Sequence, residues 1–435
     1  MKAKQRLYAS CTLGLALGLV LPVVRDLVGA FKPDERVLAW ELYNEPTASL
    51  PLRVTTGELR ASGQTATGTN PLLPEVQVFR SGAEGYHTLR IPAVVRATNG
   101  TLLAFAEGRR HNGGDTGAID LVLKRSFDNG HAWGPLQLVA RDGTNTVGNP
   151  MPIVDSATGK IVLLTTRNAG SATETQIRAG AVNDRRVFVQ ESLDQGATWS
   201  APREITLEAK RPNWRWYGTG PGHGLQLQRG PHAGRLVAPC DHSTTNSADW
   251  AACGVHLLYS DDGGATWHVG ADDSPNSGLI NPNECAAVEL TDGRIYLAAR
   301  DQGGRGAGHR AVAYSGDGGL TFAAPSTTEP HLVSPVVQGS LLRYSGTGPN
   351  ARAPRILFSA PGDPERRRRM TIRTSLDETR TWGAGKVIYG GPSAYSDLVE
   401  LSDGRIGLLY ESGVSSPYER IAFATCDTAF LDSPE

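Results

Sequence analysis

The chain has 435 residues, with 43 Lys and Arg against 44 Asp and Glu, and its formal net charge is -1. This balance excludes the global basic field of a nucleic-acid-binding protein, and there is no acidic tail. The 51 glycines and 27 prolines, with few long runs of helix formers, predict many short strands joined by tight turns. Five scattered cysteines exclude a disulfide scaffold, and no zinc-type spacing of Cys or His occurs. We therefore expect no metal and no organic cofactor.

The N-terminus begins like an export signal. Lys2, Lys4 and Arg6 precede an apolar run over residues 7–24, which is the order found in signal peptides and in single membrane anchors. Because an A-x-A cleavage signal is missing, both alternatives stay open for residues 1–24. We expect a secreted or cell-envelope protein, in which this segment is the one part of the chain that could associate with a membrane.

Residues 25–75 are expected to form a non-catalytic N-terminal segment and linker. Within them, 37–46 resembles the strand-end motif of TIM-barrel glycosidases, in which the glutamate before proline is a general acid. No further β/α units follow to build such a barrel, so Glu45 is not expected to be catalytic. Residues 47–75 are rich in Thr, Ser, Gly and Pro, a composition typical of linkers.

A repeated turn pattern, Ser-x-Asp-x-Gly-x-Thr-Trp, organises the rest of the chain. Its copies, here called turn boxes, lie at 126–133, 192–199, 260–267, 315–322 and 375–382. The fifth copy is decayed, with Thr379 at the glycine position. In such a box the Asp side chain closes a hairpin on backbone N–H groups, the glycine supplies positive φ, and the aromatic residue is expected to pack the turn onto its own sheet. We interpret the boxes as scaffold.

A hydrophobic strand after a glycine or basic turn precedes each box. Six such strands occur, at 99–105, 159–164, 234–238, 292–297, 354–358 and 403–408. There are only five boxes, and 421–427 is interpreted as a strand whose box has been lost. Because short antiparallel repeats cannot bury a core singly, radial closure is expected. The prediction for 76–435 is an all-β, six-bladed β-propeller with four-stranded antiparallel blades.

Two alternatives accompany this fold. A row of immunoglobulin-like sandwiches would also repeat short strands, but no linker-like composition separates the repeats after residue 76. Cys240 and Cys253 could form a disulfide across one blade, although buried free thiols are favoured.

Three motifs, taken in their order along the chain, resemble those of the sialidases, or neuraminidases, a family of glycoside hydrolases. The resemblance is particularly to the bacterial members. The three motifs are Arg90-Ile91-Pro92, the repeated turn boxes (the Asp boxes of that family), and Gly391-Pro-Ser-Ala-Tyr395-Ser-Asp. The resemblance implies an exo-α-sialidase that hydrolyses terminal α-linked sialic acids of glycoproteins, glycolipids and oligosaccharides. Two alternatives stay open: a trans-sialidase, which uses a sugar acceptor in place of water, and a non-catalytic glycan-binding propeller.

The resemblance assigns three arginines to the carboxylate of the sialic acid. Guanidinium groups match a carboxylate bidentately and stay charged at any working pH. Arg90 matches the first arginine and Arg300 the second. The third falls within the four arginines 366–369, where the family's spacing to the next strand favours Arg367, with Arg368 as the alternative.

The same resemblance implies a tyrosine nucleophile. A carboxylate nucleophile would be repelled by the carboxylate of the substrate, and sialidases use a tyrosine instead, here Tyr395. The phenol has an ordinary pKa near 10, so it needs a base, and Glu284 matches that position. Attack by tyrosine and then by water predicts retention of configuration. Glu411 matches the glutamate that orients the first arginine.

Asp115 matches the acid that protonates the leaving group. It lies in a glycine-rich loop that we place just after the inner strand of the first blade. Its spacing from Arg109 matches the family, in which that arginine lies near the acyl group of the sugar; a structural role for Arg109 is the alternative. Asp120 is the competing acid, but strand alternation favours a structural role for it. An ordinary Asp pKa near 4 is low for this task, so either burial raises the pKa of Asp115 or the activity optimum is acidic.

Overall fold

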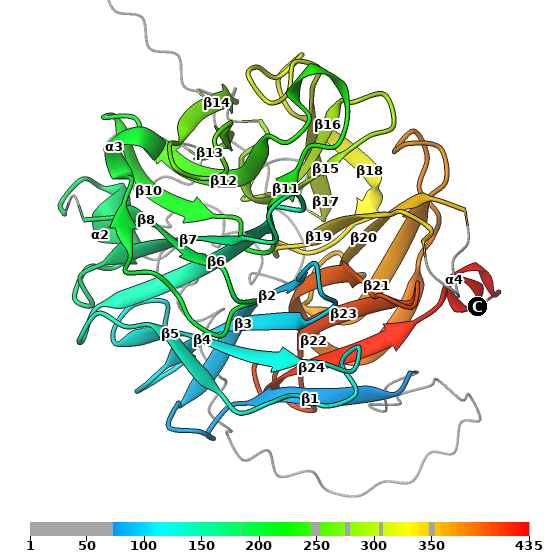
Figure 1. Cartoon of the computed structure of the whole chain (residues 1–435), viewed down its shortest axis with the longest axis horizontal. Coiled ribbons are helices and arrows are strands. Elements are labelled where there is room, and N and C mark those ends of the chain that lie inside the picture. The colour runs from blue at the N-terminus through cyan, green and yellow to red at the C-terminus, as the bar shows by residue number, and fades with distance from the viewer. Residues whose placement is uncertain are drawn as a thin grey trace, which may run out of the picture. The chain divides into compact units, whose positions relative to one another are not determined.

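The computed structural model describes residues 73–182, 184–244, 253–274, 279–303, 308–347 and 353–434. These residues form a six-bladed β-propeller of antiparallel blades, so the predicted fold class is confirmed (Figure 1). Within these ranges, no helix has both the length and the apolar character needed to cross a membrane. The expected export signal, Glu45 and nearly all of the linker lie outside the described residues, and what was expected of them stays a prediction.

Successive strands of the chain form successive blades, from the inner strand outwards. The first blade contains β2 (Thr88–Arg96), β3 (Leu102–Arg109), β4 (Ile119–Ser126) and β5 (Gln137–Ala140). The second contains β6 (Thr146–Val154), β7 (Ile161–Asn168), β8 (Arg186–Ser192) and β9 (Arg203–Glu204). The third contains an interrupted inner strand, β10 (Trp214–Thr219) with β11 (Leu225–Gln226), followed by β12 (Leu236–Thr244), β13 (Cys253–Ser260) and β14 (His268–Asp272).

The remaining three blades continue this order. The fourth contains β15 (Pro282–Glu289), β16 (Ile295–Asp301), β17 (His309–Ser315) and β18 (Thr327–Val333). The fifth contains β19 (Ser340–Tyr344), β20 (Arg355–Pro361), β21 (Arg368–Ser375) and the first half of β22 (Lys386–Glu400). The sixth contains the second half of β22, then β23 (Ile406–Ser412), β24 (Arg420–Cys426) and β1 (Glu75–Arg80). The six hydrophobic strands predicted from the sequence are the second strands of the six blades. Short helices are α2 (Glu174–Arg178), α3 (Thr206–Ala209), α4 (Thr428–Asp432) and the 3₁₀ turn η1 (Gly230–His232).

The sixth blade joins the two ends of the propeller. β1 pairs with β24, so the outer strand of this blade comes from the start of the domain. This arrangement explains why 421–427 has no turn box. A box turns the chain from the third strand of a blade to the fourth. β24 is the third strand of the sixth blade, but the fourth strand is β1, from the start of the domain, so the chain continues from β24 into α4 and needs no such turn. β1 begins at Glu75, one residue before the expected start of the propeller.

The turn boxes close hairpins as predicted. In the second box, Asp194 accepts hydrogen bonds from Ser192 Oγ at 2.9 Å, from Thr198 N at 2.8 Å and from Thr198 Oγ1 at 2.6 Å. These bonds to the charged form hold the pKa of Asp194 below its ordinary value. The carboxylate therefore serves the turn and has no spare role in binding.

The aromatic residue of a box packs against the preceding blade as well as its own sheet, so the expectation covered only part of its contacts. Trp382 lies near Phe358 of its own blade and Tyr296 of the preceding one. Trp199 of the second blade lies against Phe105 of the first, with ring centroids 5.8 Å apart. A Cβ added at the box glycine Gly196 would lie 2.3 Å from Leu103, also in the first blade. The turn lies where two sheets wedge together, so the ring fills the space between them. This box therefore joins its blade to the preceding one.

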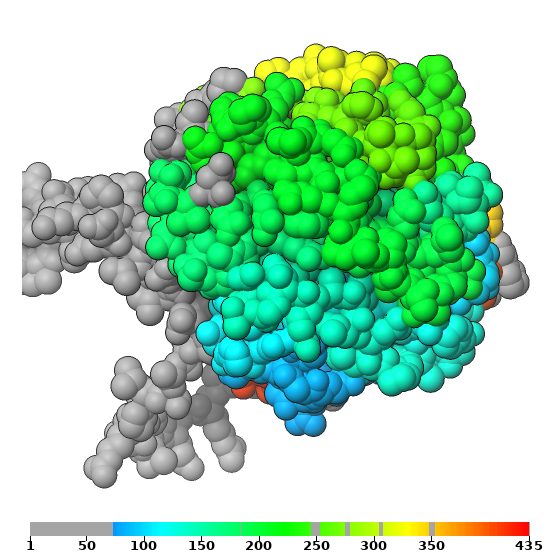
Figure 2. Space-filling model, turned by 60° about the vertical axis from the view of Figure 1, so that its left-hand side comes forward, coloured from blue at the N-terminus to red at the C-terminus, as the bar shows by residue number. Residues whose placement is uncertain are grey.

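The core is divided among neighbouring blades. One cluster combines Val162 and Leu164 of the second blade with Leu236 and Trp267 of the third. Each blade is thus covered by the two beside it, as in other repeat folds. Figure 2 shows consecutive blades side by side along one side of the molecule, in the order of the colour bar.

Cys240 and Cys253 are buried free thiols, as favoured by the sequence. In the β12–β13 register, Cys240 lies opposite His256 and Cys253 opposite Ser243. The two sulfur atoms are therefore on different rungs of the ladder and form no disulfide.

Candidate active site

Three of the predicted site residues, Arg90, Glu284 and Tyr395, lie on inner strands, each at an irregularity of its strand. The register shifts fall between Arg90 and Ala93 in β2, between Pro282 and Cys285 in β15, and between Ser393 and Ser396 in β22. A β-bulge bends its strand and re-aims a side chain. In β2, Ile91 has a φ of 59°, a left-handed value unfavourable for a β-branched residue. Its N–H donates to Glu411 at 2.9 Å, which holds that conformation.

Tyr395 and Glu284 form a hydrogen-bonded pair. The Tyr395 hydroxyl donates to Glu284 Oε1 at 2.5 Å, and Arg300 Nη1 donates to Glu284 Oε2 at 2.6 Å and to the tyrosine oxygen at 3.2 Å. Tyr395 is only 5% exposed. Burial first, and then Glu284, raise the pKa of Tyr395 above its ordinary value, and the nearby arginines offset this only in part. The resting phenol is therefore neutral, with its proton directed at a carboxylate.

The three predicted arginines surround this pair. Arg90 donates to Glu411 through Nε at 3.1 Å and Nη2 at 3.3 Å. Glu411 is fully buried and also accepts the Tyr395 N–H at 3.1 Å, so it couples Arg90 to the strand that carries Tyr395. Arg300 donates through Nε to Gln302 at 2.6 Å. The guanidinium of Arg367 lies 5.6 Å from the centroid of the Tyr395 ring.

Of the four consecutive arginines, the structure brings Arg367 to the site and not Arg368. Arg368 Nε binds Asp363 at 2.6 Å on the surface, and its side chain is half exposed. Arg366 and Arg369 are exposed as well. This is the arrangement expected if Arg367, and not Arg368, is the third arginine. That Arg367 binds substrate stays a prediction.

Asp115 lies at the open side of the cluster, in the loop between β3 and β4. It therefore follows the second strand of the first blade, and the expectation that it follows the inner strand was wrong. Its Oδ1 lies 2.7 Å from Arg109 Nη2 and 3.6 Å from Arg90 Nη1, and its side chain is 45% exposed. Burial acts to raise the pKa of Asp115, but Arg109 and Arg90 outweigh it and hold the pKa below its ordinary value. The pKa of Asp115 is thus lowered and not raised, and an acidic optimum of activity is the alternative that remains.

Asp120 has the structural role that strand alternation predicted. It accepts hydrogen bonds from Tyr86 at 2.9 Å and from the side chains of Arg110 and Arg141. Arg109 binds Glu107 at 2.8 Å as well as Asp115 at 2.7 Å, contacts that suit the structural role, and its place near the acyl group of the sugar stays a prediction.

Comparison with known proteins identifies the family. A BNR repeat-like domain matches residues 100–408. The sialidase of Micromonospora viridifaciens is 33% identical over 402 residues, covering 90% of this chain and 60% of that protein. The exo-alpha-sialidase of Aspergillus fumigatus is 32% identical, covering 75% of this chain and 79% of that protein. The chain belongs to the sialidase family.

Solved structures agree with this assignment. The Hadza microbial sialidase Hz136 has a TM-score of 0.70 at 27% identity, covering 82% of this chain and 69% of that one. The intramolecular trans-sialidase of Ruminococcus gnavus has a TM-score of 0.67 at 20% identity, a likeness that shows the fold alone. This sialidase-family chain spans 60% of the length of its Micromonospora relative.

Sequence reasoning missed three residues of this sialidase site. Asp241 is 1% exposed and accepts from Asn283 Nδ2 at 3.0 Å; burial, with Glu284 and Glu174 adding to it, raises its pKa to about 8. Glu174 opens α2, and burial raises its pKa to about 7. Tyr418 lies in the loop after β23. The sequence did carry a signal for Asp241. It is a charged residue near the end of the second strand of its blade, β12, as Arg300 is in β16.

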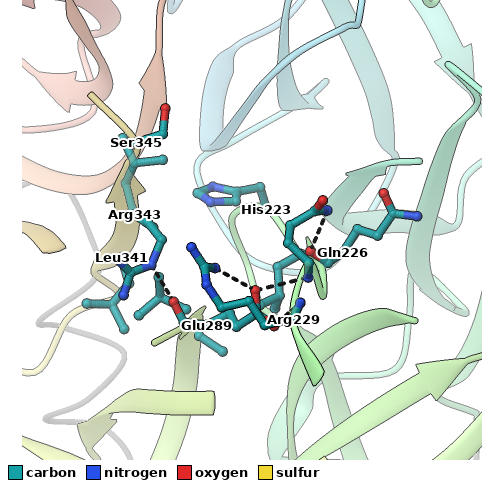
Figure 3. Close-up of a pocket in the computed structure, with 12 residues that line it drawn as sticks. His223, Gln226, Arg229, Glu289, Leu341, Arg343 and Ser345 are labelled. Carbon is teal, nitrogen blue, oxygen red and sulfur yellow. Dashed lines mark hydrogen bonds and ion pairs between the residues drawn. The ribbon is translucent and has the colours of Figure 1, made fainter. Parts of the chain in front are cut away.

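A cavity of about 300 Å³ is lined by residues of β11, β15 and β19, and of these strands β15 also carries Glu284 (Figure 3). β15 carries Glu284 near its start and Glu289 at its end, roughly 16 Å apart on an extended strand. The charged side chains that face this cavity are bonded in pairs. They are His223 Nδ1 with Asp397 at 2.7 Å, Arg229 Nη1 with Glu289 at 2.9 Å, and Arg343 Nη2 with Glu378 at 2.5 Å. Glu284 of the sialidase site and Glu289 of this cavity thus lie toward opposite ends of β15.

Proposed function

We propose that this protein is an exo-α-sialidase that hydrolyses terminal α-ketosidic sialic acids of glycoproteins, glycolipids and oligosaccharides with retention of configuration. The observation that carries the proposal is the 2.5 Å hydrogen bond from Tyr395 to Glu284, with Arg90, Arg300 and Arg367 around it. A sialic acid has a carboxylate on its anomeric carbon. Arginines suit that carboxylate, and a neutral phenol is not repelled by it as an ionised nucleophile would be.

In the first step, the arginines bind the carboxylate and Asp115 donates its proton to the glycosidic oxygen as the bond to the anomeric carbon breaks. The oxygen of Tyr395 attacks that carbon, and Glu284 takes the phenol proton. Arg300, 3.2 Å from the phenol oxygen, stabilises the negative charge that develops there. The exposed position of Asp115 suits a group that meets the departing aglycone.

In the second step, Asp115 takes a proton from water and the resulting hydroxide attacks the anomeric carbon. The phenol oxygen leaves and recovers its proton from Glu284, so the site returns to its starting state. Each displacement inverts the carbon, and two inversions give net retention.

The test uses the purified protein with a fluorogenic α-sialoside. We expect release of the fluorophore, competition by a 2,3-unsaturated sialic acid analogue, and the α-anomer as the first product in early proton NMR spectra. Tyr395→Phe should lower kcat at least about 10²-fold, because the attacking oxygen is gone. No release above background would refute the activity, and an initial β-anomer would refute the double displacement. Sialyl transfer to an added sugar in place of hydrolysis would favour a trans-sialidase.

A further inference from the structure

We infer that Tyr418 is a positioning residue for two of the carboxylate-binding arginines, a role that rests on the proposed function. Arg367 Nη1 donates to the Tyr418 hydroxyl at 2.7 Å. The guanidinium carbon of Arg90 lies 4.2 Å from the centroid of the same ring. One side chain thus contacts the first and the third arginine through two different groups.

The backbone around Tyr418 is fixed by the protein itself. The loop 413–419 joins β23 to β24, and the carboxylate of Glu419 accepts the N–H groups of Val414 at 3.0 Å, Ser415 at 2.7 Å and Ser416 at 2.8 Å. The carbonyl of Tyr418 accepts from Ser81 Oγ at 2.8 Å. Because the loop is held by these bonds, the ring is in place before any ligand binds, which lowers the cost of ordering the site.

Arg367 is the arginine that most needs such a partner. Among the described residues it makes no ion pair with a carboxylate, and its buried Nε has no hydrogen-bond partner. Its Nη2 donates to the carbonyl of Val336 at 3.0 Å. The two groups that orient this guanidinium, the Tyr418 hydroxyl and a carbonyl, are both uncharged. Such acceptors hold the guanidinium plane without competing for its charge, so that charge stays available to the carboxylate of a ligand.

The ring of Tyr418 has a separate task. Arg90 lies between two aromatic rings, with Tyr418 at 4.2 Å and Tyr395 at 5.0 Å from its guanidinium carbon. A cation over the face of a phenol ring is attracted to it. The ring therefore limits the plane of Arg90, while the hydroxyl limits that of Arg367.

Two variants separate these tasks. Tyr418→Phe removes only the hydroxyl, and KM for the fluorogenic sialoside should rise about tenfold with kcat within about threefold, as for a lost hydrogen bond to a charged group. Tyr418→Leu removes the ring as well, and kcat/KM should fall about 100-fold. The matched control is Tyr344→Phe, whose buried hydroxyl donates to Gly404 O and touches no arginine of the site. Its KM should equal that of the wild type.

A double-mutant cycle distinguishes positioning from a general loss of structure. In an R367A background, Y418F should raise KM less than about twofold, because the residue through which the hydroxyl acts is absent; in an R300A background it should still cost about tenfold. Calorimetric binding of the 2,3-unsaturated analogue should follow the same pattern. Equal effects in both backgrounds, or a Y418F enzyme with wild-type KM, would overturn the inference while leaving the proposed function standing. A wild-type protein that neither binds the analogue nor releases the fluorophore would overturn both.

Discussion

Two regions of the propeller, the cavity and the sialidase site, meet opposite ends of β15 and balance their charges differently. At the cavity end, His223, Arg229 and Arg343 each have a carboxylate partner. At the sialidase end, Arg367 makes no ion pair among the described residues, and burial raises the pKa of Asp241 to about 8. The balanced end stabilises the fold. We expect the charge that Arg367 leaves unpaired at the unbalanced end to serve an anion from outside, at a cost in stability.

The largest expected effect comes from the two glutamates of β15. Glu284→Gln should lower kcat at least about 10²-fold, because the phenol loses its base. Glu289→Gln should leave kcat within about twofold but cost about 1–3 kcal/mol of unfolding free energy, because Glu289 binds Gln228 N, Arg229 N and Arg229 Nη1. The measurements are kcat on the fluorogenic sialoside and the denaturant midpoint of unfolding. The comparison breaks if both variants lose activity equally.

The arginines give a smaller contrast. Arg367→Ala should raise KM about 10- to 100-fold with little loss of stability, since the removed charge has no carboxylate partner to leave behind. Arg343→Ala should do the reverse, because it strands the carboxylate of Glu378. Arg368→Ala serves as the control for Arg367, as it binds only Asp363 on the surface. Equal KM values for the Arg367 and Arg368 variants would reject the assignment of Arg367 as the third carboxylate-binding arginine.

The smallest expected effects are on pH dependence, and they differ between the two ends. Asp115 must carry a proton to act as the acid, and Arg109 and Arg90 hold its pKa below the ordinary value against the effect of burial. kcat/KM should therefore fall as pH rises from the acidic range. At the other end, burial acts to lower the pKa of His223, but Asp397 raises it above the ordinary value.

The His223–Asp397 pair therefore contributes stability that is fully present below the unfolded pKa of about 6.5 and is lost as pH rises through the folded pKa. His223→Asn should remove this alkaline decline in melting temperature and leave the kcat/KM profile unchanged. Parallel thermal scans and rate profiles check both statements. A variant whose rate profile shifts would show that the two ends are coupled.

The propeller could be predicted because its signals are local. A turn box and a hydrophobic strand are each legible within about ten residues, since an Asp-closed turn and a buried strand depend on near neighbours. The pairing of β1 with β24 has no such signal, and 421–427 therefore looked like a strand with a missing turn. The packing of Trp199 on Phe105 was missed for the same reason, because it depends on how two sheets meet.

Motifs could predict which residues gather at the candidate site, but not their environment. Tyr395 and Glu284 were found from the family pattern, and the structure places them 2.5 Å apart. The bulges that aim them have no distinct sequence pattern. The pKa of Asp115 depends on the positions of Arg109 and Arg90 in space, which a sequence does not contain. Tyr418 was missed because its contacts depend on a loop held by Glu419 and Ser81.

The pairing of β1 with β24 also sets the order in which the protein can form during synthesis. Glu75 pairs with Ala424, and the residues between them take roughly 20–70 s to translate at about 5–20 residues per second. During that time β1 has an unpaired strand edge, and the first blade lacks the sheet that will cover its far side. Closing a loop of this length costs about 5 kcal/mol of chain entropy. The ring of six blades therefore closes last, once β24 has left the ribosome and can pair with β1.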